Sequence, residues 1–141
     1  MSASELREKP KRRGRIVSWI LVVVWTAIIF ALSAIPGSGL PPHPEPLNVV
    51  AHFCLYLVFG ALLSYALSFT KLSLWKVALI ALAIASLYGA SDELHQLFVP
   101  GRHCDPFDWL TDTLGALVGV CGMVFFISSK IVSRSRKRDR K

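Results

Sequence analysis

The sequence predicts an all-α polytopic membrane protein, a compact bundle of four transmembrane helices with both termini in the cytoplasm. Of its 141 residues, 53% are hydrophobic and only 18% are charged, whereas a soluble domain has about 25% charged residues. Four long stretches are nearly free of charge, and about 20 apolar residues are enough to cross a bilayer. The net charge of +7 comes mainly from basic residues near the two ends of the chain.

The composition also excludes several classes of protein. A disordered chain has low hydrophobicity, and three cysteines do not support a small disulfide-built domain. A soluble helical bundle would keep a polar stripe facing water, and the apolar stretches carry none. We expect one domain at this length, residues 16–132, between two basic tails, residues 1–15 and 133–141.

The first predicted helix covers residues 16–35, which include no charged residue. A basic segment precedes it, and Ala31-Leu32-Ser33 is a small-residue site of the kind that follows a secretory signal peptide. Signal peptides have an apolar core of about 7–15 residues. The greater length of this stretch therefore predicts a retained signal-anchor helix.

Three further helices are predicted over residues 49–69, 72–98 and 107–132. The first of these is interrupted only by His52. The next keeps an apolar face until Pro100-Gly101, a pair that ends a helix. Together with the first helix, they give four membrane crossings.

Basic residues predict the orientation, because Lys and Arg stay cytoplasmic in short loops. The two tails, the connection between the second and third helices and the adjoining helix ends lie on one side, with fifteen basic and three acidic residues, a net +12. The other side has only Arg102 against six acidic residues, a net −5. We therefore expect cytoplasmic termini, with tails that act as topogenic signals and contact anionic lipid rather than nucleic acid.

The two external connections differ in character. Residues 36–46 hold five of the eight prolines and predict an extended connector, in which His43 and Glu45 receive no role. Residues 91–112 instead concentrate polar side chains. These are Asp92, Glu93, His95, Gln96, Arg102, His103, Asp105, Asp108 and Asp112.

Three predicted helices each direct a polar row toward the external half of the bundle, since residues four apart share a helix face. The rows are Asn48, His52 and Tyr56; Tyr88, Asp92 and Gln96, with His95 beside them; and Asp108 and Asp112, followed by Gly115 and Gly119. His52 lies about 6 Å deeper than the start of its row, where an ionisable group needs a partner or a wet cavity. We expect His52, Asp92 and Asp112 to meet, with Arg102 available to neutralise them.

Two local signals concern structure rather than chemistry. Small-x-x-x-small patterns, which allow helices to pack closely, occur twice, at Gly115 and Gly119 and at Gly60 and Ser64. Asp105 precedes a proline and is a suitable N-cap for the fourth helix.

The acidic residues of this segment are potential metal ligands. A hard-cation site would use Asp92, Asp105, Asp108 and Asp112, because carboxylates bind such ions. The histidine and cysteine spacings match no metal motif. We therefore predict no metal and no cofactor, with the hard-cation site as an alternative.

Catalysis and simple neutralisation are further alternatives. The chain has no standard nucleophile motif, although Ser91, Asp92 and His52 can be drawn as a triad. Asp92 or Glu93 with His52 would form an acid–base pair. In the structural alternative, Arg102 ties the carboxylates together in a salt-bridge network. The surplus of carboxylates over one arginine favours a cation, a cationic ligand or protonated acids.

The polar residues fall into three spaced motifs. They read Asn48-x-x-x-His52-Phe53-x-x-Tyr56, Ser91-Asp92-Glu93-x-x-Gln96-x-Phe98-x-Pro100-Gly101-Arg102, and Asp108-x-x-x-Asp112-x-x-Gly115-x-x-x-Gly119. Together, across about residues 16–130, they resemble the VanZ-like family of bacterial integral membrane proteins. The resemblance implies a multi-pass protein of the bacterial cytoplasmic membrane. It also implies an accessory role in antibiotic resistance, since the namesake gives low-level protection against the glycopeptide teicoplanin without remodelling the peptidoglycan precursor.

Two positions depart from the family pattern. Asp112 stands where members usually have Asn, and Val49 and Val50 stand where many members have a basic residue. Both departures make the external face more acidic.

We therefore expect a protein, without enzymatic activity, whose external polar site engages a cell-envelope component, such as a lipid-linked precursor, or a lipophilic glycopeptide antibiotic. The expected site residues are Asn48, His52, Tyr56, Ser91, Asp92, Glu93, Gln96, Pro100, Gly101, Arg102, Asp108 and Asp112. The expected partners are the lipid bilayer and further copies of this chain, without nucleic acid. The alternatives are an intramembrane hydrolase or transferase acting on a lipid headgroup, and a small proton- or cation-coupled carrier.

Overall fold

The structure, a computed structural model, describes residues 3–37 and 45–139. These form four helices: α1 (Ala3–Ser33), α2 (Glu45–Leu67), α3 (Leu74–Gln96) and α4 (Pro106–Asp139). Each contains a segment long and apolar enough to cross a membrane, so the predicted all-α fold with four spans is confirmed. α1 and α4 extend into the basic tails. His43 and most of the proline-rich connector lie outside the described residues.

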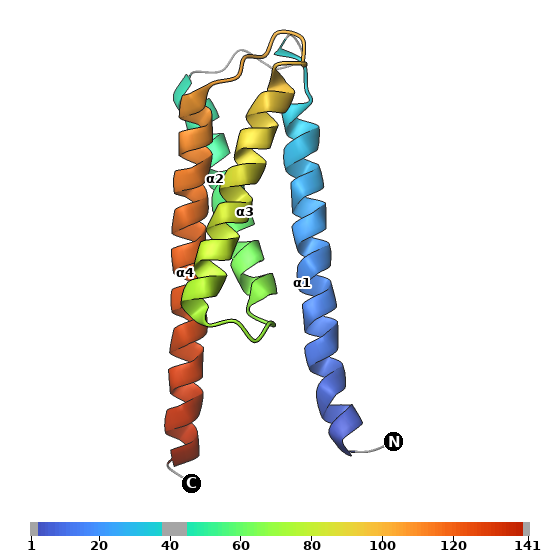
Figure 1. The fold of residues 1–141 in the computed structure, drawn as a ribbon, viewed down its shortest axis with the longest axis vertical. Coiled ribbons are helices and arrows are strands. Elements are labelled where there is room, and N and C mark those ends of the chain that lie inside the picture. The colour runs from blue at the N-terminus through green and yellow to red at the C-terminus, as the bar shows by residue number, and fades with distance from the viewer. Residues whose placement is uncertain (1–2, 38–44, 140–141) are drawn as a thin grey trace.

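The helices run up and down, so that both termini lie at one end of the bundle (Figure 1). The α2–α3 connection lies nearer to that end, and the last turn of α1, the start of α2 and the α3–α4 connection lie at the opposite end. We call the latter the pocket end. α2, α3 and α4 form the tighter group, and α1 packs more lightly against α2 and α3.

Glycine allows α2 and α4 to approach closely. A Cβ atom at Gly115 or Gly119 of α4 would overlap the backbone carbonyl oxygen of Phe53 or Leu57 in α2. Gly60 of α2 faces the backbone of α4 in the same way. The predicted close packing is confirmed, and it fixes the polar row of α2 against that of α4.

Most of the bundle surface is apolar, as a lipid environment requires. Large side chains such as Trp75, Leu87 and Phe125 are 62%, 71% and 74% exposed. The buried core is small and consists of Val22, Ile29, Tyr56, Phe59, Leu63, Ala66, Leu67, Val77, Ala81, Ala85, Ala116 and Val120. Four apolar helices with such a surface make this a multi-pass membrane protein.

The connection between α3 and α4 is a tight turn at the pocket end. Gly101 has a φ of 73°, which glycine adopts readily. Asp105 caps α4 as predicted, because its Oδ1 accepts a hydrogen bond of 2.8 Å from the amide of Phe107. The amide of Gly37, just after α1, donates to the carbonyl of Pro100 at 3.0 Å. These contacts hold the turn against the end of α1.

Candidate functional site

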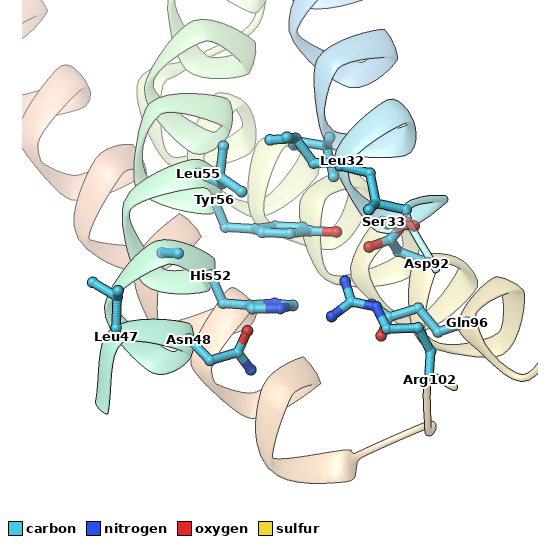
Figure 2. Close-up of a pocket in the computed structure, with 13 residues that line it drawn as sticks. Leu32, Ser33, Leu47, Asn48, His52, Leu55, Tyr56, Asp92, Gln96 and Arg102 are labelled. Carbon is cyan, nitrogen blue, oxygen red and sulfur yellow. The ribbon is translucent and has the colours of Figure 1, made fainter. Parts of the chain in front are cut away.

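A cavity of about 280 Å³ opens at the pocket end, bordered mainly by α1, α2 and α3 (Figure 2). We call it the pocket. One side is an apolar wall made by Ile29, Leu32, Ile35, Leu47, Ala51 and Leu55. Six predicted site residues form its polar end: Asn48, His52, Tyr56, Asp92, Gln96 and Arg102. Two of the three predicted rows, those on α2 and α3, therefore meet around one cavity.

Arg102 faces the pocket without a carboxylate partner. Figure 2 shows its guanidinium group directed toward the imidazole of His52, with Gln96 beside it. Among the described residues, no acidic side chain lies within ion-pair distance of Arg102, and its buried Nε has no hydrogen-bond partner. The alternative of a salt-bridge network around Arg102 is therefore wrong for this part of the chain.

The carboxylates instead face other polar groups, and two of them lie near the imidazole ring of His52. The Nδ1 atom of His52 lies 3.0 Å from Oδ1 of Asp112, and Nε2 lies 3.9 Å from Oδ2 of Asp108. The side-chain amide of Asn48 donates to the same Oδ2 of Asp108 at 3.2 Å. His52 and Asp112 thus meet as expected. Asp92 lies across the pocket from His52 (Figure 2).

Glu93 is buried behind the pocket, with 3% of its surface exposed. One of its oxygens accepts the amide hydrogen of Asp105 at 2.9 Å, and the other accepts from the side chain of Gln96 at 3.3 Å. Its carboxylate also lies close to the side chains of His52 and Asp112. One ligand atom from each of His52, Glu93 and Asp112 lies within 4.8 Å of the other two.

The expected hard-cation set does not assemble. Among the described residues, the group of histidine, cysteine or acidic side chains that converges tightly is His52, Glu93 and Asp112. Asp105 is exposed and its side chain caps α4, because the start of that helix has free amides to satisfy.

Besides Glu93, Asp108 and Asp112, three further predicted site residues lie outside the pocket lining. Ser91 is exposed, and its hydroxyl donates to the carbonyl of Tyr88 at 2.7 Å, so the Ser91–Asp92–His52 triad is not formed. Pro100 and Gly101 shape the α3–α4 turn and contact the chain after α1.

α1 supplies site residues that sequence reasoning missed. Ser33 is 5% exposed and lines the pocket beside Asp92 (Figure 2). Its hydroxyl lies 3.3 Å from Nδ1 of His95, and the ring of Phe30 stacks on His95 at 4.7 Å between centroids. A polar residue at the end of an otherwise apolar stretch was the available signal for Ser33.

Several buried polar atoms around the pocket lack a hydrogen-bond partner among the described residues. They are the hydroxyl of Tyr56, Oδ2 of Asp112 and Nε of Arg102. Buried polar groups are nearly always satisfied by protein, water or ligand. The pocket thus combines an apolar wall, unsatisfied polar groups and one free guanidinium group.

The family model VanZ/LLP1 matches residues 16–128. The chain belongs to the VanZ/LLP1 family. The match confirms the resemblance seen in the three motifs, and it spans the pocket and every predicted site residue. No curated protein and no solved structure matches the chain.

Proposed function

We propose that this VanZ/LLP1 family protein binds an amphipathic molecule of the bacterial cell envelope in the pocket. The ligand is a lipid-linked envelope precursor or a lipophilic glycopeptide antibiotic, the second giving a teicoplanin-resistance-like accessory role. The observation that carries the proposal is that one cavity joins an apolar wall to a set of polar side chains with unsatisfied donors.

The apolar wall suits an acyl or isoprenoid chain. Ile29, deep in the wall, is 2% exposed, whereas Leu32 and Leu47 are 43% and 57% exposed. The pocket therefore leads from the bundle interior to the surface that α1 and α2 present to lipid. A ligand with an apolar chain can enter from the bilayer without passing through water.

The polar end suits a headgroup rich in oxygen acceptors, such as a phosphate ester. Arg102, Asn48 and Gln96 all carry N–H donors that line the pocket, and an arginine binds phosphate or carboxylate with charge-assisted hydrogen bonds. Of the acidic residues on this face, Asp92 lines the pocket, whereas Glu93 and Asp108 lie outside its lining. Glu93 and Asp108 each accept a hydrogen bond from other protein groups.

The orientation is part of the proposal, with the termini in the cytoplasm and the pocket end outside. Both termini lie at one end of the bundle, and the pocket end carries Arg102 as its basic residue among those described.

The accessibility of Cys104, in the α3–α4 turn, tests this orientation directly. In a Cys54→Ala, Cys121→Ala background, an impermeant thiol reagent should label Cys104 in intact cells. Labelling only after lysis would reverse the orientation.

Native mass spectrometry of the protein extracted with its lipids tests the binding proposal. We expect the wild-type chain to retain an amphiphile and Ala51→Phe, which fills the pocket from α2, to lose it. Ala83→Phe is the matched control, because Ala83 is also exposed on its helix but lies on α3 outside the pocket lining. Equal retention by the two variants, or no retained amphiphile in the wild type, would contradict the proposal.

An intramembrane hydrolase or transferase is the second candidate, favoured by the contact between His52 and Asp112. With Asp112 ionised, its carboxylate accepts the hydrogen from Nδ1, and Nε2 is left as a base. His52 also lines the pocket. The enzyme candidate predicts that a bound amphiphile changes mass on incubation and that His52→Gln stops this change. An unchanged ligand mass with the wild-type protein excludes it.

A further inference from the structure

Behind the polar end of the pocket, three buried side chains from three helices converge. His52 comes from α2, Glu93 from α3 and Asp112 from α4, and they are 9%, 3% and 0% exposed. One ligand atom from each lies within 4.8 Å of the other two. Three elements far apart in sequence thus direct nitrogen and oxygen donors to one point.

Apart from His52, no basic side chain among the described residues balances the charges at this point. Among the described residues, neither Glu93 nor Asp112 has a lysine or arginine within ion-pair distance. Oδ2 of the fully buried Asp112 has no hydrogen-bond partner within the described chain. An isolated carboxylate in an apolar interior is very unfavourable unless it is paired or coordinates a cation.

We propose that His52, Glu93 and Asp112 bind a divalent transition-metal ion of the Zn²⁺ or Mn²⁺ type. Imidazole favours zinc and carboxylates favour manganese, while the nitrogen donor disfavours Mg²⁺ and Ca²⁺. Ligands of a tetrahedral ion with bonds of about 2.1 Å lie about 3.4 Å apart. Two ligand atoms that are 4.8 Å apart reach that distance when each moves by about 0.7 Å.

Three protein ligands leave a coordination position open, as in catalytic metal sites rather than structural ones. His52 belongs both to this cluster and to the pocket lining. A bound ion therefore lies next to the headgroup end of the pocket. Metal binding at this site does not require the proposed envelope ligand, and the experiment below is carried out without that ligand.

The test is metal binding by tag-free protein in detergent, stripped with a chelator and then dialysed against Zn²⁺ or Mn²⁺, with the metal measured by mass spectrometry. We expect a single ion per chain. Glu93→Gln and Asp112→Asn should each weaken binding about tenfold or more. Each variant keeps a side-chain oxygen that can accept the hydrogen bond from the Asp105 amide or from His52, so each should still fold.

Asp92→Asn is the matched control, since Asp92 precedes Glu93 on α3 and is similarly buried at 5% but lies outside the converging group. It should bind metal as the wild type does. The proposal is overturned if the wild type takes up no stoichiometric Zn²⁺ or Mn²⁺. It is also overturned if Glu93→Gln, eluting as a folded species in gel filtration, binds with wild-type affinity.

Discussion

Replacing Tyr56 by phenylalanine should stabilise the ligand-free protein, although Tyr56 is among its most buried side chains. Tyr56 is 1% exposed, and its hydroxyl has no hydrogen-bond partner among the described residues. A buried polar group without a partner costs about 1–3 kcal/mol. Phenylalanine removes that cost and keeps the ring, which packs edge-on against Phe59 at 6.0 Å. We expect the free energy of unfolding to rise by about 1 kcal/mol.

Tyr88→Phe is the matched control with the opposite expected sign. The ring of Tyr88 also packs edge-on against Phe59, with 5.3 Å between the ring centroids. Its hydroxyl donates to the carbonyl of Thr26 at 2.8 Å and so ties α3 to α1. Loss of a hydrogen bond of this kind lowers the free energy of unfolding by about 0.5–1.5 kcal/mol.

Both variants can be compared by thermal or denaturant unfolding of delipidated protein in one detergent. With ligand bound, Tyr56→Phe should lose one hydrogen bond to the headgroup, which weakens affinity about two- to tenfold. A rise in stability together with a fall in affinity would mark the hydroxyl as a ligand-binding group. If Tyr56→Phe destabilises the delipidated protein as much as Tyr88→Phe does, the hydroxyl has a partner in the free protein and the reasoning fails.

Two further predictions concern the frame that holds the pocket. Gly119→Ala should lower the free energy of unfolding by about 1–3 kcal/mol, because the added methyl group meets the carbonyl of Leu57. Gly122→Ala is the control, because its methyl group enters open space and should not lower the stability. Equal thermal stability of the two variants would refute the close approach of α2 and α4. Asp105→Ala should lower the free energy of unfolding by about 1 kcal/mol through loss of the α4 cap, and Asp105→Asn should lower it much less. Equal decreases for the two variants in denaturant unfolding would count against the cap.

Hydropathy and residue spacing predict much of this structure. Uncharged stretches identify the four helices, and the four-residue spacing of Asn48, His52 and Tyr56 places them correctly on one face. Gly115 and Gly119 mark the contact of α4 with α2. Each of these signals is local, because it depends on the period of a single helix.

The arrangement between helices is less accessible to sequence reasoning. The first apolar stretch has almost no polar face, and a single serine at its end is a weak signal for which side of α1 meets the pocket, so the role of Ser33 was missed. The choice of partner for each carboxylate also depends on side-chain geometry. Glu93 reaches the amide of Asp105, and this leaves Arg102 unpaired among the described residues.

The most direct test of the central claim is to map where an amphiphile contacts the protein. A lipid-linked phosphate ester with a photoreactive diazirine in its apolar chain can be crosslinked in membranes and the adducts located by peptide mass spectrometry. Binding in the pocket predicts adducts concentrated at Ile29, Leu32 and Leu55, competed away by excess unlabelled compound. Adducts spread evenly over the lipid-facing surfaces, including Leu79 and Phe125, and insensitive to competition would contradict the claim.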